Sequence, residues 1–261
     1  MSRIEQAFSR LRAEKRTGLV TYVTAGDPSM AATADILRTL AGSGADVLEV
    51  GVPFSDPLAD GPVIQRATER ALAAGATLGG VLDMLARVRA QIDAPIVIFS
   101  YANPILRMGL ERFARRAREA GVDGVLTLDV PPEEAEEWRQ RFGTAGIDTI
   151  FLLSPTTADD RIRRAAALGS GFLYGISRLG VTGARDEVAD SAAELAARVR
   201  AATDMPLALG FGVSRPEHVR AIGDIADAAV VGSALVNVIA EQGGSPNLLA
   251  EVERYVRWLR N

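Results

Sequence analysis

The chain has 261 residues, 48% of them hydrophobic and 24% charged, which is typical of a folded globular protein and not of a disordered one. Its net charge of −4, without a Lys- or Arg-rich block, argues against nucleic-acid and anionic-membrane partners. Because there is no run of about 18 apolar residues and the N-terminal stretch is charged and amphipathic, we expect a cytoplasmic protein without a membrane span.

Three scarce residue types narrow the chemistry. The chain has no Cys, which excludes thiol nucleophiles, disulfides and thiolate metal sites. A single histidine, His218, excludes a metal site built from several histidines of one chain. A single lysine, Lys15, leaves almost no candidate for a Schiff base. Acid–base catalysis must therefore use Asp, Glu or Tyr.

In chain order, a first amphipathic helix carries Ile4, Phe8 and Leu11 on one face. Eight apolar, β-rich segments follow, separated by helical segments with apolar residues three and four positions apart. The predicted strands are Leu19–Ala25, Asp46–Val52, Pro95–Tyr101, Gly124–Val130, Asp148–Ser154, Gly171–Ser177, Pro206–Val213 and Ala228–Leu235. Several of these segments are almost continuously hydrophobic, as parallel strands covered on both faces are.

Eight repeated strand–helix units without a break in composition predict an α/β fold, a single (β/α)8 TIM barrel spanning residues 1–261 with an extra N-terminal helix. We expect that helix to cover the N-terminal mouth of the barrel. An open doubly wound parallel sheet is the alternative, because strand counts from one sequence can slip by one or two.

Two connections are longer than strand–helix turns usually require. One is Pro53–Pro62, after the second strand, and the other is Arg178–Asp190, after the sixth. Both fall on the face where barrels of this kind place their active sites. Lys15 precedes the first strand and belongs to the opposite mouth, which makes a catalytic lysine improbable.

Carboxylates occur at the end of the second strand and in the loop that follows it. Glu49 lies inside the apolar run Val47–Gly51, where it is either a catalytic group or a paired structural charge. Burial would raise its pKa and suit it to proton transfer near neutral pH. Asp56 and Asp60 lie in the loop and are either turn formers or a second carboxylate facing the same pocket.

Glycines mark the ends of the last two predicted strands. Gly210–Gly212 closes the seventh, and Val231–Ala234 closes the eighth. These positions bind phosphate in many barrels through backbone N–H groups and the N-terminus of a short helix. Two glycine-rich turns in these positions favour a phosphorylated substrate. The loop Gly180–Gly183, which includes Thr182, could add donors and act as a lid.

Four aromatic residues lie near the predicted strand ends. Tyr174 is either an acid or oxyanion donor, or a core aromatic residue. Tyr22, Tyr101 and Phe211 are interpreted as the lining of a flat apolar slot.

The segment LEVGVPFSDPLADGPVIQ at 48–65 closely resembles the signature of the tryptophan synthase alpha subunit family. The resemblance covers essentially the whole chain and includes, in the right order, TAGDPS, YANPIL, DVPPEE, SRLGVTGAR, GFGVSRPEHV and VVGSALV. Other phosphate-binding barrels share the glycines but not the PFSDPLADGP loop.

This resemblance implies retro-aldol cleavage of indole-3-glycerol phosphate to indole and glyceraldehyde 3-phosphate. Glu49 then corresponds to the general acid/base at indole C3 and at the side-chain hydroxyl. Asp60 corresponds to the carboxylate that contacts the indole N–H. Tyr174 matches the active-site tyrosine of the family, and the phosphate-binding positions are Gly183, Gly212, Gly232 and Ser233.

The resemblance also implies a partner. Family members pass indole to a beta subunit in an α2β2 complex, and that subunit carries the pyridoxal phosphate. No cofactor or metal is expected in this chain. The positions that fall in segments resembling the contact surface are Pro53, Asp56, Pro57, Asn103 and Pro131.

Two other functions remain open at this stage. The chain could be a stand-alone lyase that releases free indole, or a mainly regulatory module that activates its partner. The presence of Glu49, Asp60 and the phosphate-site glycines argues against an inactive scaffold.

Overall fold

In a computed structural model, residues 1–176, 185–210 and 212–261 are described, with the side chains of 185–190 left out. Within these residues the strands are β1 (Gly18–Thr24), β2 (Val47–Gly51), β3 (Ile96–Ser100), β4 (Gly124–Thr127), β5 (Asp148–Leu153), β6 (Leu173–Ile176), β7 (Leu207–Gly210) and β8 (Ala228–Val231). Each strand pairs in parallel with the next, and β8 pairs with β1. The predicted closed barrel is confirmed, and the open sheet is excluded.

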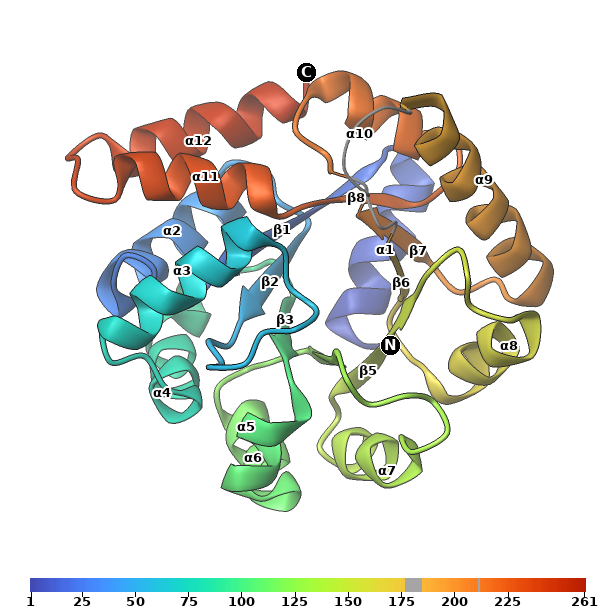
Figure 1. Cartoon of the computed structure of the whole chain (residues 1–261), viewed down its shortest axis with the longest axis horizontal. Coiled ribbons are helices and arrows are strands. Elements are labelled where there is room, and N and C mark those ends of the chain that lie inside the picture. Colours follow the sequence, from blue (N-terminus) through green and yellow to red (C-terminus); the bar gives the residue numbers. More distant parts are fainter. Residues whose placement is uncertain (177–184, 211) are drawn as a thin grey trace.

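Helices surround the barrel, and Figure 1 shows them as an outer ring around the strands. Their bounds are α1 (Arg3–Glu14), α2 (Met30–Gly42), α3 (Pro62–Ala73), α4 (Leu78–Val88), the 3₁₀ turn η1 (Arg89–Gln91), α5 (Ala102–Met108), α6 (Leu110–Glu119), α7 (Glu136–Thr144), α8 (Asp159–Leu168), α9 (Arg185–Ala202), α10 (Pro216–Gly223), α11 (Ser233–Gln242) and α12 (Leu248–Leu259).

The N-terminal helix α1 closes one end of the barrel, as predicted. Ser2 and Glu5 form a reciprocal capping box that fixes its first turn. Ile4, Phe8 and Leu11 are buried in one cluster with residues that point into the barrel. Lys15 ends the helix in a left-handed conformation, with φ of 51°, and so lies at this closed end.

Polar residues tie the strands together at this N-terminal end. The carboxylates of Asp46, Asp123 and Asp227 accept the N–H groups of Leu19, Ile96 and Leu207 at 2.8–2.9 Å, and the Ser170 hydroxyl accepts that of Thr149 at 3.0 Å. Each acceptor precedes an even-numbered strand, and each donor lies at the start of the odd-numbered strand before it.

Arginines complete this polar layer. Arg16 makes a bidentate pair with Asp46 at 2.8 and 2.9 Å, and Arg12 of α1 bonds Asp227 at 3.0 Å. The N-terminal end is thus held by charge-assisted bonds whose acceptors are largely buried, which makes it a rigid base.

The structure corrects three predicted boundaries. The strands predicted to reach Val213 and Leu235 end at Gly210 and Val231, because Gly212 turns the chain with φ of 64° and α11 begins at Ser233. The loop predicted at Arg178–Asp190 was wrong from Arg185 onward, where α9 begins. The helix as a whole is rich in Ala, the strongest helix former, and it begins with acidic residues, which favour a helix N-terminus.

No single helix among the described residues is long and apolar enough to cross a membrane. Only α3 and the stretch Leu78–Gln91 pass that test together, and they meet at an angle of 89°.

Candidate active site

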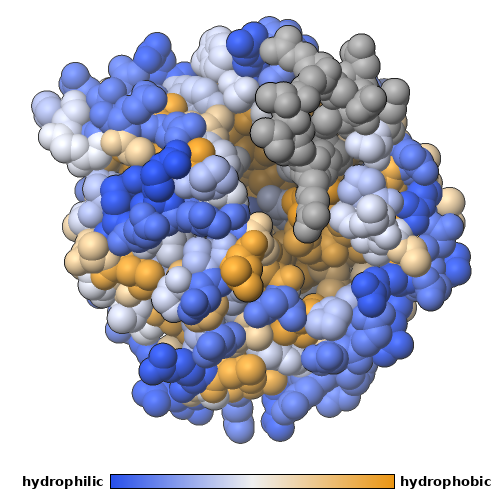
Figure 2. Space-filling model, in the orientation of Figure 1, coloured by the Kyte–Doolittle hydropathy of each residue, from blue (hydrophilic) through white to orange (hydrophobic). Residues whose placement is uncertain are grey.

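A cavity of about 380 Å³ opens at the C-terminal end of the barrel. Figure 2 shows the corresponding hollow, with hydrophobic residues inside it and mostly hydrophilic residues around it. Its wall combines apolar side chains from the strands with polar groups from the loops that follow β2, β7 and β8. This is the face on which the sequence predicted the site.

Glu49 is the central buried carboxyl group. It is fully buried on β2, while its neighbours Leu48 and Val50 pack in the outer core and Val47 packs inside the barrel. Alternate residues of a strand share a face, so Glu49 points into the barrel with Val47. Within the described part of the chain, neither carboxylate oxygen has a hydrogen-bond partner of normal geometry. A buried carboxyl group without a charge partner has no structural role in an ion pair, so the catalytic interpretation is favoured.

Burial sets the protonation state of Glu49. Desolvation raises its pKa to about 8, and the nearby Tyr174 hydroxyl opposes part of this rise. Burial and the facing Glu49 in turn raise the pKa of Tyr174 well above its ordinary value. At neutral pH Glu49 is therefore mostly protonated and can act as an acid, and the Tyr174 hydroxyl remains a donor.

Asp60 is the second carboxylate of the site and lies in the cavity wall. The Tyr101 hydroxyl donates to its Oδ2 at 3.2 Å. Burial raises the pKa of Asp60 to about 6, and the bond from Tyr101 opposes the rise. Asp60 is therefore mostly ionised at neutral pH, unlike Glu49. Two carboxyl groups with different protonation states are suited to acid–base catalysis.

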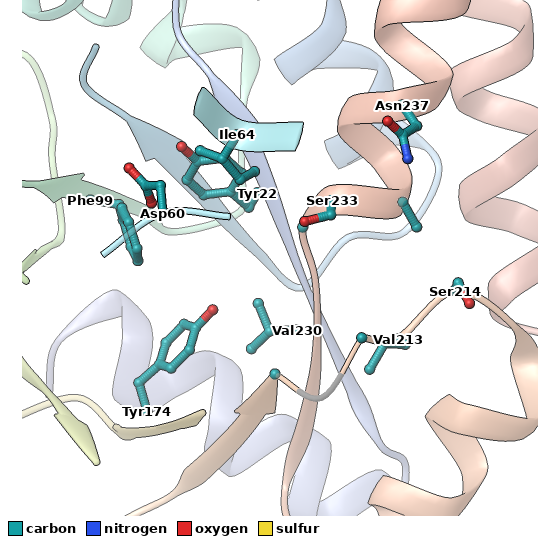
Figure 3. A pocket seen from close by; sticks show the side chains of 14 residues that line it. Tyr22, Asp60, Ile64, Phe99, Tyr174, Val213, Ser214, Val230, Ser233 and Asn237 are labelled. Carbon is teal, nitrogen blue, oxygen red and sulfur yellow. The ribbon is translucent and has the colours of Figure 1, made fainter. Parts of the chain in front are cut away.

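Tyr22 is buried beside these groups, with its ring edge-on to Phe99 at 5.3 Å between centroids. Its hydroxyl occupies the space over Gly51, where an added Cβ would lie only 2.1 Å from that oxygen. Glycine at 51 is thus required for Tyr22 to lie flat against the strands. Figure 3 shows Tyr22, Phe99 and Tyr174 around the part of the cavity nearest Asp60.

The opposite side of the cavity is formed by backbone. Gly232 and Ser233 line it at the start of α11, and this helix has no side-chain cap. Gly210 and Gly212 line the adjacent turn after β7. Uncapped N–H groups at a helix N-terminus form an anion site, strengthened by the helix dipole. Figure 3 places Ser233 on the other side of the cavity from Asp60.

The structure thus brings Asp60, Tyr22 and Tyr174 together with the predicted phosphate turns in one cavity wall. Glu49 is not part of that wall and lies behind it, where it faces Tyr22 and Tyr174. Tyr101 is buried, and it contacts Asp60 without belonging to the cavity wall. Three predicted residues, Thr182, Gly183 and Phe211, lie outside the described part of the chain.

The residues predicted to contact a partner lie around the same mouth. Asp56 and Asn103 are exposed, Pro57 and Pro131 are half-buried, and Pro53 is buried within the chain. Leu58, at the tip of the same loop as Asp56, is 93% exposed.

Sequence reasoning missed two polar residues of the wall, Ser214 and Asn237. A signal existed for Asn237, which follows Ser233 by four positions and so shares its helix face. The single histidine, His218, is half-buried and accepts the Ser214 N–H through Nδ1 at 3.3 Å. Within the residues that the structure describes, no group of three His, Asp or Glu side chains could hold a metal ion.

Comparisons with known proteins agree with this geometry. The sequence model of the family described as tryptophan synthase alpha chain matches residues 8–260. A tryptophan synthase alpha chain from Geobacter sulfurreducens is 50% identical over 260 residues, covering 100% of this chain and 98% of the relative. One from Burkholderia pseudomallei is 48% identical, covering 100% and 96%.

Solved structures give the same result. The tryptophan synthase alpha subunit of Legionella pneumophila superposes with a TM-score of 0.90 at 37% identity, covering 100% of this chain and 97% of that one. A chain of Mycobacterium tuberculosis tryptophan synthase in its aminoacrylate-bound form gives 0.90 at 33% identity, covering 100% and 98%.

Proposed function

Because the chain belongs to the tryptophan synthase alpha chain family, we propose that Glu49 and Asp60 carry out that family's reaction in the cavity described above. The enzyme is a lyase that cleaves indole-3-glycerol phosphate to indole and glyceraldehyde 3-phosphate. The observation that supports the assignment of residues is that the buried Glu49 and the ionised Asp60 both face Tyr22 and Tyr174.

The two carboxyl groups have different tasks, since Glu49 transfers protons and Asp60 stabilises charge. Protonated Glu49 donates a proton to indole C3, and the positive charge that develops on the ring nitrogen is stabilised by the Asp60 carboxylate. Ionised Glu49 then takes the proton of the hydroxyl next to the ring. The bond between indole C3 and the carbinol carbon breaks, its electron pair returns to the ring, and the aldehyde forms. Glu49 ends protonated, ready for another cycle.

The rest of the cavity orients the substrate. The indole ring lies between Tyr22, Phe99 and Tyr174, and the Tyr174 hydroxyl donates to the carbinol oxygen or to Glu49. The phosphate is bound by backbone N–H groups at Gly212, Gly232 and Ser233. The proposal also includes Thr182 and Gly183 as phosphate contacts and Phe211 as a contact of the indole ring. These three assignments rest on the family's motifs alone.

The chain works with a beta subunit in an α2β2 complex, to which it passes indole. The contact surface includes Asp56, Pro57, Asn103 and Pro131, with Pro53 supporting it from beneath. Pyridoxal phosphate belongs to the beta subunit. This chain uses no cofactor, because Glu49 supplies the proton transfers that a retro-aldol reaction requires and Asp60 stabilises the charge that develops. Residues 1–261 form one domain, and the enzyme is cytoplasmic.

The test is indole release from indole-3-glycerol phosphate by the purified chain, with and without a beta subunit. We expect slow release by the chain alone and a sharp increase when the partner is added. Fast release in both conditions would indicate a stand-alone lyase. No release in either condition would contradict the proposal and indicate a binding module.

The pH dependence of kcat/KM should be bell-shaped. Activity requires ionised Asp60, so it falls as pH drops below about 6, and it requires protonated Glu49, so it falls as pH rises above about 8. The measurement is kcat/KM from pH 5 to 9.5. Because a phosphate monoester also titrates near pH 6, the binding of glycerol 3-phosphate is measured over the same range and its titration is subtracted. A profile flat between pH 7 and 9.5 would contradict the role of Glu49 as acid.

A further inference from the structure

Asp60 lies in a loop, and its carboxylate must nevertheless be held at a fixed place if it is to meet the indole nitrogen. The segment between β2 and α3 contains no helix or strand that could fix it. Its tip is open to solvent, since Leu58 is 93% exposed. A turn within the loop, in which the Asp60 N–H donates to the Pro57 carbonyl at 3.1 Å, holds the backbone but not the side chain. The contacts that place the Asp60 carboxylate must therefore come from elsewhere in the chain.

One side chain, Tyr101, makes three contacts with this loop. Its hydroxyl accepts the Ala59 N–H at 2.9 Å and donates to Asp60 Oδ2 at 3.2 Å. Its ring packs against Phe54, with 5.2 Å between centroids. The hydroxyl thus uses its acceptor and its donor on consecutive residues, while the ring supports the start of the loop.

Tyr101 is itself anchored. It directly follows β3 and is buried, with only 6% of its surface exposed. The Ser100 hydroxyl donates to the Tyr101 carbonyl at 2.9 Å, and the next backbone N–H, of Ala102, donates to Asp129 at 2.7 Å. The phenol therefore extends from the barrel wall, which gives the loop a rigid reference point.

We propose that Tyr101 is a positioning residue for Asp60. The Tyr101 hydroxyl fixes the loop carboxylate at the indole end of the cavity and keeps it in the ionised form. This rests on the proposed function only in assigning Asp60 to the reaction. It replaces the interpretation of Tyr101 as part of the slot that binds the ring. A second bond, from the Gln65 side-chain amide to the Asp60 carbonyl at 2.9 Å, holds the backbone and leaves the carboxylate to Tyr101.

The electrostatic surroundings agree with this role. Burial raises the pKa of Asp60, and the bond from Tyr101 lowers it. Among the side chains that the structure describes, the other titratable groups facing Asp60 are Tyr22 from β1 and Tyr174 from β6, with Glu49 of β2 facing both tyrosines. Asp129, after β4, faces Tyr101 from the other side. Glu49 is mostly neutral at pH 7 and the tyrosines are neutral, so the Tyr101 hydroxyl is the donor that favours the charged form of Asp60.

The test is Tyr101→Phe, which removes the hydroxyl and keeps the ring on Phe54. The carboxyl carbon of Asp60 is followed by ¹³C NMR from pH 4 to 8 in the free, folded chain, with Asp60→Asn used to assign the signal. We expect the titration midpoint to rise by about 0.5–1 pH unit. With substrate, kcat should fall about 10-fold, while the affinity for glycerol 3-phosphate stays unchanged. The acid limb of the kcat/KM profile should move to higher pH by the same amount as the Asp60 titration midpoint.

Tyr255→Phe is the matched control, because it removes a half-buried hydroxyl that donates to the Ser214 carbonyl at 3.2 Å, away from Asp60. The Asp60 titration should not move in this variant. An unchanged Asp60 midpoint in folded Tyr101→Phe would overturn the proposal. The NMR titration requires no turnover, so the proposed function can fail, through absent indole release, independently of the contact between Tyr101 and Asp60.

Discussion

Glu49→Gln should lower turnover at least about 10²-fold while substrate binding is retained. Glutamine has the shape of the protonated acid but can neither donate the proton to indole C3 nor take one from the carbinol. The measurement is kcat for indole release, together with the dissociation constant for glycerol 3-phosphate. Glu241→Gln, on the exposed face of α11, is the control and should keep normal turnover. Near-normal turnover in Glu49→Gln would exclude Glu49 as the acid.

The same variant should be more stable than the natural chain near neutral pH. In the unfolded chain Glu49 ionises at its ordinary pKa of 4.5, and in the folded chain only near 8. The folded form therefore binds the proton more tightly, so the contribution of Glu49 to stability is complete below pH 4.5 and is lost as pH rises towards 8.

Glutamine does not titrate, so the free energy of unfolding of Glu49→Gln should exceed that of the natural chain by an amount that grows between pH 4.5 and 8. The difference should reach about 3 kcal/mol at pH 7. Urea unfolding at pH 5, 7 and 8 measures it. A difference in stability that does not depend on pH would contradict the raised pKa.

Gly232→Val should weaken binding of glycerol 3-phosphate at least about 30-fold, because the new side chain occupies the space where the phosphate meets the α11 N–H groups. In the free chain there is room for it, since an added Cβ would have Tyr22 Cβ at 3.8 Å as its nearest neighbour. The loss should therefore be in binding, with little change in the free energy of unfolding. Calorimetric titration measures the first and urea unfolding the second.

Gly143→Val is the matched control. Gly143 lies on α7, and an added Cβ there would meet no atom within 4 Å. Binding should be normal in this variant. If Gly232→Val also bound normally, the phosphate would have to lie elsewhere.

The barrel could be predicted because it depends on local patterns, since almost continuous apolar runs are typical of parallel strands covered on both faces. The side on which Glu49 points came from the structure, where Val47 packs inside the barrel and Leu48 and Val50 pack outside it. The helix face with Ile4, Phe8 and Leu11 predicted what covers the N-terminal mouth, and the structure confirms it.

Other features depend on contacts between distant residues. The Ala59–Tyr101 bond joins positions 42 apart in the chain, so no pattern around Tyr101 reveals it. The fit of Tyr22 over Gly51 joins two strands and also has no local signature. The start of α9 was misplaced because an expected lid loop was given priority over the helix propensity of the residues after Arg185.

At the closed end of the barrel, backbone N–H groups donate to one side chain for every two strands. The accepting side chains are those of Asp46, Asp123, Ser170 and Asp227. In this respect the barrel is a ring of four similar two-stranded modules, a pseudo-fourfold arrangement unrelated to the reaction. Each module is joined at the end far from the cavity. The opposite rim can therefore carry unlike loops, a carboxylate on one module and phosphate turns on another, without weakening the bonds that join the two strands of each module.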